Sequence, residues 1–430
     1  MANAYERIAQ QTGKHERVQT LMHYVNKQNL MEEHRLQQKG KAKGIDGVDK
    51  EAYGENIETT LDDLLARMKT FGYRPQAVRR TYIPKAGSDK LRPLGIPAYE
   101  DKLVQGVMRK VIDQIYEGKF YDFSYGFREG KSCHLAIREV NQLIMTKKIG
   151  FIVDADICGF FDNLDHEWLM KFLEHEIADK NFLRYVKRFL KAGIMEDMQF
   201  KESDKGSPQG GLISPVCANV YLHYVLDMWF DKVVKKQCNG EAHMVRYADD
   251  FICMFQYENE ANAFYEALEA RLKKFNLELS KDKSKVIPFG RFAKQHSANG
   301  KTDTFDFLGF THINGKTRKG KYTVLHRTSQ KKLKAKKQIV KEWLKENIHG
   351  KPSDTIERLN KKLVGHYRYY GISGNYEGLL KFYRHITTAL YTTLKRRSQR
   401  TYLTWGRYRT LLEKHPIAKP KILVNIWQAV

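Results

Sequence analysis

The stretch MVRYADDFICMF (244–255) predicts a β-hairpin, because two apolar arms flank a short acidic tip. A second apolar segment, FIVDADI (151–157), has the length and composition of a buried strand and also carries acids. Helical patterns lie between these strands, around 165–192 and 215–236. Strands and helices combined in this way indicate an α+β core.

Acidic side chains occupy these apolar strands. Asp156 ends the first strand, and Asp249 and Asp250 lie at the tip of the hairpin. A buried carboxylate is costly unless a cation or a partner neutralises it. Mg²⁺ prefers hard oxygen ligands, and a pair of such ions can catalyse in-line displacement at phosphorus. An Asp-Asp dipeptide taken alone more often caps a turn or pairs with a surface lysine, so this interpretation depends on the surrounding motifs.

The chain is strongly basic. It has 75 Lys and Arg against 50 Asp and Glu, a net charge of +25. A polyanion is the natural partner, because each neutralised phosphate releases condensed counterions. A merely basic surface and a peripheral membrane protein are the alternatives.

Other classes fit the composition poorly. No apolar stretch of about 20 residues and no signal-like start is present, so a membrane-spanning or secreted protein is not expected. A cytoplasmic protein is expected instead. The cysteines are scattered without a CxxC pair, which argues against a disulfide framework or a Cys-based zinc site.

The segments outside this core differ from it in composition and charge. Residues 78–97 predict two short strands joined by a glycine-containing turn, with basic residues on both arms. After about residue 329 the chain becomes basic, with helices predicted around 354–370 and 376–399. Many lysines of this part are expected to face nucleic acid, and its aromatic rings either stack on nucleic acid or pack between helices.

Ordered blocks of the sequence resemble the reverse transcriptases encoded within bacterial group II introns. YADD (247–250) resembles motif C, DADICGFFDNLDH (154–166) resembles motif A, and SPQGGLISPVCANVYL (207–222) resembles motif B. Further blocks extend the resemblance over nearly the whole chain. Three are similar to the finger blocks: GIDGVD (44–49), YIPKAGSDKLRPLGIP (82–97) and YGFREGKSCHLAI (125–137). LELSKDKSKV (277–286) resembles motif D, FDFLGF (305–310) resembles motif E, and LNKKLVGHYRYYGIS (359–373) and HPIAKPKILVNIW (415–427) resemble the thumb or maturase X region.

The resemblance implies a right-hand polymerase of α+β class. Its fingers and palm contain an antiparallel sheet packed on helices, and an all-α thumb follows. The expected division is an N-terminal extension (1–40), fingers with part of the palm interleaved (41–150), a palm with motifs A to E (151–325) and a basic helical thumb or maturase X domain (326–430).

The implied activity is that of an RNA-directed DNA polymerase, which copies RNA into cDNA with two Mg²⁺ ions that Mn²⁺ can replace. The implied partners are dNTPs, an RNA template, an RNA/DNA hybrid, intron RNA and target DNA, and a maturase function in intron splicing and retromobility is implied. No HNH endonuclease segment follows the thumb region, so another mode of priming is expected. Two alternatives are an RNA-binding splicing factor that keeps the polymerase fold as a scaffold, and a reverse transcriptase with a defence or other host role.

The resemblance also assigns a metal site. Asp156, Asp249 and Asp250 are the implied catalytic, metal-binding carboxylates, and the backbone carbonyl of Ile157 is an added ligand. Asp154 is a rival to Asp156, because side chains two positions apart on a strand share a face. The register of the motif favours Asp156.

Nucleotide contacts are implied for five positions. Lys85 and Arg92 in the basic hairpin suit triphosphate oxygens, although either could be a solvated charge. Gln209 is implied to contact the nucleotide or template, and Lys283 is a candidate proton donor to the departing pyrophosphate or a surface lysine. Phe161 occupies the position at which the family places a bulky side chain under the deoxyribose, and core packing is its alternative role.

The neighbouring Phe160 is expected in the core, because adjacent strand positions face opposite ways.

Template and primer contacts are implied for a further set. Tyr247 is expected to support the primer end. Arg246 is either a phosphate contact or a structural salt-bridge partner. The rest of the set comes from motifs B and E: Pro208, Gly210, Leu308 and Gly309.

Overall fold

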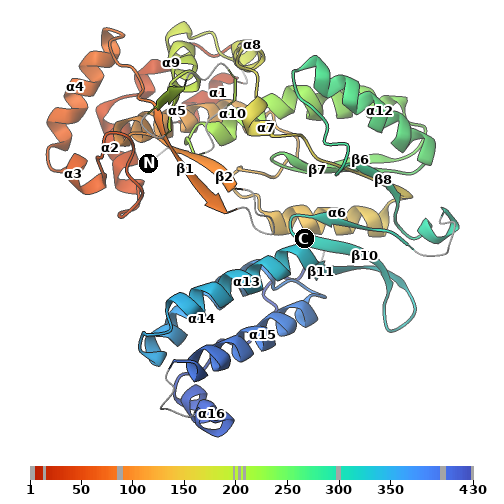
Figure 1. Ribbon diagram of the computed structural model, residues 1–430. Coiled ribbons are helices and arrows are strands. Elements are labelled where there is room, and N and C mark those ends of the chain that lie inside the picture. The colour runs from red at the N-terminus through yellow and green to blue at the C-terminus, as the bar shows by residue number, and fades with distance from the viewer. Residues whose placement is uncertain are drawn as a thin grey trace.

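The computed structural model describes residues 5–12, 16–84, 91–196, 199–201, 205–206, 210–296, 302–397 and 403–427. Its elements form three successive groups (Figure 1). The first group contains α1 (Glu6–Thr12), η1 (Met22–Tyr24), α2 (Lys27–Leu36), α3 (Lys50–Gly54), α4 (Ile57–Lys69), β1 (Val78–Pro84), β2 (Leu91–Ile96), α5 (Tyr99–Tyr116) and α6 (Cys133–Thr146).

The second group carries the central sheet. It contains β3 (Phe151–Ala155), α7 (Phe160–Asn163), α8 (His166–Glu176), α9 (Lys180–Leu190), β4 (Ile194–Glu196), β5 (Gln199–Lys201), α10 (Ser214–Leu222), η2 (His223–Asp227), η3 (Phe230–Val234), α11 (Lys235–Gln237), β6 (Ala242–Tyr247), β7 (Asp250–Phe255), α12 (Glu258–Lys274), β8 (Lys285–Pro288), η4 (Ala293–His296), β9 (Thr304–Phe307), β10 (Phe310–Lys316) and β11 (Tyr322–Thr328). The third group contains α13 (Gln330–Glu346), α14 (Pro352–Tyr370), α15 (Tyr376–Lys395) and α16 (Trp405–Lys414).

The central sheet has the strand order β6-β7-β3-β8, and all its pairs are antiparallel. Successive side chains of a strand point to opposite faces. Phe151 and Val153 therefore pack in one core with Leu268 of α12, whereas Ile152 packs in a second core with Val140 of α6. Figure 1 shows α12 and α6 on opposite sides of this sheet. The predicted α+β class and antiparallel sheet are confirmed.

The basic hairpin predicted at 78–97 is present, with Tyr82 opposite Pro93 in the antiparallel pair of β1 and β2. These strands continue into β4 and β5 to give the order β2-β1-β4-β5. A separate three-stranded sheet has the order β11-β10-β9, and a tight turn at Leu308 and Gly309 joins β9 to β10. Both residues have positive φ, 49° and 79°, as a two-residue hairpin of this kind requires.

The C-terminal helices have a core of their own. Leu344, Leu359 and Ile386 from α13, α14 and α15 are buried together. The buried side chain of Asn375 ties these helices to the small sheet: it accepts a hydrogen bond from the Thr328 N–H and donates to Thr328 Oγ1. Most rings of this part pack between helices, as the buried Tyr367 and Tyr408 show.

One local expectation was wrong. Phe160 and Phe161 do not occupy adjacent strand positions but lie on the one-turn helix α7, which follows Gly159 at φ 49°. The left-handed conformation of Gly159 turns the chain out of the sheet. Phe160 is nevertheless buried in the core, as expected, and Phe161 is half-buried beside it. In the part of the chain described above, no helix is long and apolar enough to cross a membrane.

Candidate active site

The pairing of the strands brings distant aspartates together. Ala155 of β3 lies opposite Phe251 of β7, so the next position, Asp156, follows opposite Asp250. Asp249 sits beside them in the two-residue turn that joins β6 to β7. Asp154, Asp156 and Asp250 point to the same face of the sheet, because β-strand side chains alternate.

The electrostatics of the cluster confirm this proximity. Burial, together with the neighbouring carboxylates of Asp154 and Asp249, raises the pKa of Asp250 to about 7. Burial, followed by the charge of Asp156, raises the pKa of Asp249, and Arg92 acts in the opposite direction. Asp154 has its pKa raised to about 6 by burial, which Lys285 opposes. Carboxylates that repel one another in this way would gain from a nearby cation.

Asp156 is held by the loop before β8. Its backbone N–H donates to Ser284 Oγ at 3.1 Å, and its carbonyl accepts from the Ser280 N–H at 2.8 Å. Lys283 Nζ lies 2.6 Å from Asp156 Oδ2 with its side chain 63% exposed, and this hydrogen bond raises the pKa of the lysine. A predicted proton donor is thereby placed beside a predicted metal ligand.

The carbonyl of Ile157 points toward the same region. The Cys158 N–H donates to the Glu278 carbonyl, and Ile157 forms an antiparallel bridge with Leu279. Because alternate carbonyls of an extended chain point in opposite directions, the carbonyl of Ile157 faces away from this segment, toward the start of β7.

The donor set suits a hard cation. Carboxylate and backbone carbonyl oxygens are the ligands that Mg²⁺ prefers. Within the described ranges, however, no group of three or more His, Cys, Asp or Glu side chains is arranged so that it could hold a metal ion. One carboxylate oxygen of the set, on Asp156, is instead hydrogen-bonded to Lys283.

A buried network under the turn contains Arg246, whose side chain is 0% exposed. Its Nε and Nη2 donate to the two carboxylate oxygens of Asp227 at 2.7 and 2.5 Å. Its Nη1 donates to Asn219 Oδ1 at 3.2 Å and to the Ala248 carbonyl at 3.0 Å, and its Nη2 also donates to Ser124 Oγ at 2.7 Å. Arg246 is therefore a structural residue that supports the turn, which decides between the two roles that the sequence left open.

The turn from motif E connects the aspartates to the C-terminal helices. A hydrogen bond from the Leu308 backbone to Asp250 works to lower the pKa of that carboxyl group. The Leu308 carbonyl accepts a hydrogen bond from Tyr369 Oη at 2.9 Å. Gly309 packs against Tyr370, whose hydroxyl would lie 3.1 Å from a Cβ at that position. The predicted primer-contacting turn thus lies directly beside the predicted catalytic carboxylates.

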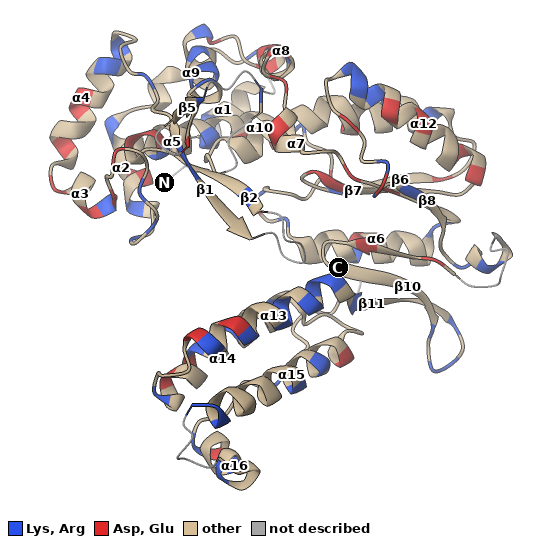
Figure 2. Ribbon diagram, viewed as in Figure 1, with Lys and Arg blue, Asp and Glu red and all other residues tan. Residues whose placement is uncertain are grey.

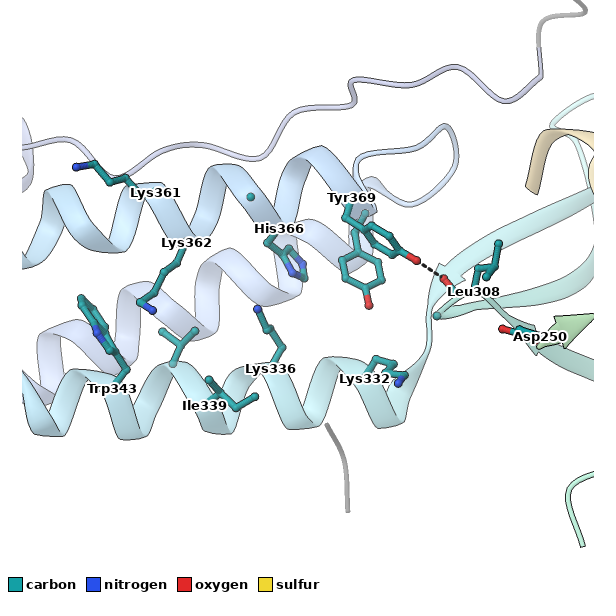
Figure 3. Close-up of a pocket in the computed structure, with 14 residues that line it drawn as sticks. Asp250, Leu308, Lys332, Lys336, Ile339, Trp343, Lys361, Lys362, His366 and Tyr369 are labelled. Carbon is teal, nitrogen blue, oxygen red and sulfur yellow. Dashed lines mark hydrogen bonds between the residues drawn. The ribbon is translucent and has the colours of Figure 1, made fainter. Parts of the chain in front are cut away.

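A groove of about 730 Å³ starts at Asp250 and this turn and continues between α13 and α14. Figure 3 shows Asp250 and Leu308 at one end and Trp343 at the other. Its lysines are Lys332, Lys336, Lys361 and Lys362. Lys362 Nζ lies 4.9 Å from the centre of the Trp343 ring. The end of the sheet that carries Asp250 therefore opens into a channel suited to a polyanion.

A family model described as reverse transcriptase (RNA-dependent DNA polymerase) matches residues 83–312, more than half of the 430 residues. The chain belongs to the reverse transcriptase family. The expected right-hand polymerase class and the resemblance to group II intron reverse transcriptases are confirmed.

Two curated relatives illustrate the similarity. The group II intron-encoded protein LtrA of Lactococcus lactis subsp. cremoris is 34% identical over 246 residues, which are 55% of this chain and 41% of LtrA. Protein YkfC of Escherichia coli is 32% identical over 323 residues, 67% of this chain and 80% of YkfC. The match therefore spans less than half the length of LtrA. Among solved structures, telomerase from Candida albicans in complex with a fragment of telomeric RNA aligns with a TM-score of 0.43 at 14% identity, over 85% of this chain and 65% of that chain.

The other predicted contact residues lie only partly within the described residues. Lys85, Pro208 and Gln209 lie outside the described residues. Arg92 is exposed on β2 within electrostatic range of Asp249. Gly210, at φ 121°, packs against β2 so closely that a Cβ would lie 2.3 Å from the Gly95 carbonyl oxygen.

Tyr247 is half-buried at the end of β6, directly opposite Asp250.

Sequence reasoning missed the individual groove residues. It treated the lysines of the C-terminal part as one basic region and did not single out Lys332 or Lys336. The spacing of Lys332 and Lys336 was an available signal, because residues four apart share one face of a helix.

Proposed function

We propose that the chain is an RNA-directed DNA polymerase that copies RNA into cDNA. The observation that carries the proposal is the arrangement of Asp156, Asp249 and Asp250 at one end of the two central strands of an antiparallel sheet, where a basic groove begins. Burial and the repulsion between these carboxylates raise the pKa of Asp250 to about 7. A protein that kept the polymerase fold only as a scaffold would have no need of such a cluster. This argument disfavours a protein that only binds RNA.

The residues would divide the work as follows. Asp156, Asp249, Asp250 and the carbonyl of Ile157 would hold two Mg²⁺ ions, or Mn²⁺ in their place. Bound there, such ions supply activation of the attacking primer oxygen and stabilisation of the leaving oxygen. Lys283 would give a proton to the departing pyrophosphate.

The nucleotide and the duplex would lie on either side of the carboxylates. Arg92 and Lys85 would bind the triphosphate of the dNTP with positive charge, and the ring of Phe161 would exclude a 2′-hydroxyl. Gln209, with Pro208 and Gly210, would contact the incoming nucleotide or the template. Tyr247 and the turn at Leu308 and Gly309 would hold the primer end.

The groove beyond that turn would hold the RNA/DNA hybrid. We accordingly assign residues 1–40 to an N-terminal extension, 41–150 to the fingers with part of the palm interleaved, 151–325 to the palm and 326–430 to the basic helical thumb or maturase X domain.

Primer extension on poly(rA)/oligo(dT) tests the polymerase. The double variant Asp249→Ala, Asp250→Ala should lose cDNA synthesis while it keeps nearly all its affinity for RNA. A matched control is Asp62→Ala with Asp63→Ala, because these adjacent aspartates are exposed on α4. Synthesis by the Asp249, Asp250 variant at the wild-type rate, or equal loss in the control, would contradict the proposal. Extension should also require added Mg²⁺.

A maturase function is the second proposal. The relative LtrA is named a group II intron-encoded protein, and a mitochondrial protein of Arabidopsis thaliana named nuclear intron maturase 1 is 25% identical over 97 residues. The basic α13 and α14 (Figure 2) offer a surface for intron RNA in addition to the hybrid. Target DNA for retromobility would be a further partner.

Splicing of the flanking intron RNA tests this second activity. Purified protein should bind that RNA at moderate salt and raise its splicing rate, and the Asp249→Ala, Asp250→Ala variant should do the same. Failure of the wild-type protein to do either would end the maturase proposal and leave the polymerase proposal intact.

A further inference from the structure

A second pocket lies away from the groove, between α6, the β10–β11 hairpin and the C-terminal tail. Its volume is about 770 Å³. We call it the α6 pocket, lined by Arg138, Asn141, Gln142, Met145, Thr146, Lys316, Thr317, Arg318, Thr323, Leu325, Ile426 and Trp427. The pocket is elongated: Ile426 packs in one cluster with Phe310, whereas Lys316, at the end of β10 farthest from the Leu308 turn, lies roughly 20 Å from that turn at about 3.3 Å per strand residue.

The wall of the α6 pocket holds polar atoms without partners. Asn141 is 6% exposed, and its Oδ1 is buried with no hydrogen-bond partner among the described residues. The Nε of Arg138, one turn earlier on α6, is likewise buried without a partner, whereas its Nη2 donates to the Asn425 carbonyl at 3.1 Å. Buried polar groups are nearly always satisfied, so an acceptor and a donor on one wall point to a polar ligand.

An aromatic ring forms the edge of the same pocket. Trp427 is 52% exposed, although its backbone is fixed: its N–H donates to Asn425 Oδ1 at 3.0 Å, and the preceding Ile426 is buried. The ring rests on Gly374, where a Cβ would lie 3.1 Å from it. A large ring that is held in place yet half open to solvent is suited to stacking against a flat ligand.

The charge of the pocket is positive. Its basic side chains are Arg138, Lys316 and Arg318, and no Asp or Glu is among the lining residues given above. The β10–β11 loop beside it also carries the exposed Lys319 and Lys321, and Figure 2 shows this loop in blue. An anionic group at the mouth would therefore be attracted.

We propose that the α6 pocket binds one unpaired nucleotide of single-stranded RNA. The base lies between the Trp427 ring and the Asn141 carboxamide, and the phosphates contact Lys316 and Arg318. A stacking ring, a buried amide and basic side chains together match a base joined to a phosphate. A lipid chain would leave Asn141 unsatisfied. The inference goes beyond the catalytic groove and rests on the proposed function only in that the chain handles RNA.

Binding of an RNA octamer, oligo(rA), to the full chain tests the proposal, with the groove first saturated by an RNA/DNA hybrid. Trp427→Ala should weaken octamer binding about five-fold or more, as for loss of one base–aromatic stack. Asn141→Leu, a change of similar volume, should also weaken it. An abasic octamer keeps the phosphates and lacks the bases, so it should bind the wild-type protein more weakly and be insensitive to Trp427→Ala.

Two controls make the result specific. Lys148→Ala removes an exposed charge just beyond α6 that does not line the pocket, so it should weaken binding less than Lys316→Ala does. Primer extension on poly(rA)/oligo(dT) should be unchanged in Trp427→Ala and Asn141→Leu, which separates this inference from the polymerase proposal and shows that the variants fold. Wild-type affinity in both variants, or equal binding of the abasic octamer by the wild-type protein, overturns the inference.

Discussion

Replacement of Arg246 by methionine should destabilise the protein strongly, although this residue would contact neither substrate nor metal. The change removes both guanidinium donors that face the carboxylate of Asp227, which is 0% exposed. An uncompensated charge is then left inside the protein, a loss that typically costs about 3–5 kcal/mol. Asn219 Oδ1 and the Ala248 carbonyl also lose a donor.

The double variant Arg246→Met, Asp227→Leu isolates the charge from the other lost hydrogen bonds. With both charges gone, an apolar pair fills the space, and such replacements are often close to neutral. The remaining loss comes from the neutral partners, at about 1 kcal/mol each. The double variant should therefore be more stable than Arg246→Met alone by about the charge term, roughly 3–5 kcal/mol.

Urea unfolding followed by tryptophan fluorescence measures the effect. At a slope of about 3 kcal/mol per molar urea, Arg246→Met should lower the midpoint by about 1 M or more. Arg409→Met, at an exposed position of α16, should leave the midpoint nearly unchanged. A shift below about 0.3 M for Arg246→Met, or a double variant less stable than the single, would refute the assignment of a paired buried charge.

Three further outcomes follow from the site. Lys283→Ala should slow single-nucleotide incorporation by about 10²-fold or more in rapid-quench experiments, because a general acid would be lost. A rate within two-fold of wild type would mean that the Lys283–Asp156 contact is only a surface ion pair. Phe161→Ala should lower the preference for dNTPs over rNTPs by roughly 10-fold or more, measured as a ratio of kcat/KM values, and an unchanged ratio would leave the ring a packing role only. Affinity for Mg²⁺, measured by calorimetry, should rise as pH increases through about 7, because the ion competes with a proton on Asp250. The stability of the metal-free protein should change in the opposite direction, because the folded state holds this proton more tightly than the unfolded state does. It should fall as pH rises from about 4 to 7, and Asp250→Asn should flatten both trends.

The elements of the fold could largely be predicted from local patterns. The hairpin at 244–255 and the strand at 151–157 carry long apolar runs, and the basic helices after residue 329 have clear periodicity. The pairing of β3 with β7 and β8 could not be derived in this way, because register between distant strands is set by the packing of whole faces and not by local periodicity. Phe160 was misplaced on a strand because the turn at Gly159 interrupts an apolar run that continues in sequence.

The aspartates of the candidate site were identified from the motifs, whereas the residues that support them were not. The partners of Arg246 come from three separate segments, at Ser124, Asn219 and Asp227. None of these residue types marks such a role by itself, so a phosphate contact and a structural ion pair were equally compatible with the sequence. The direction in which the lysines of α13 and α14 point was similarly hidden until the two helices were packed.

The buried network explains how the turn can hold its shape. Ala248 occupies the first turn position at φ 57°, where glycine is usual and where another residue is strained by about 1–2 kcal/mol. Arg246 donates to the Ala248 carbonyl, and the backbone of Gly126 approaches the turn so closely that a Cβ there would lie 2.3 Å from the Ala248 nitrogen. The surrounding structure therefore imposes the turn that its own sequence does not favour. Because Asp249 belongs to this turn and Asp250 follows it, a costly buried ion pair fixes the positions of the two carboxylates before any ligand binds.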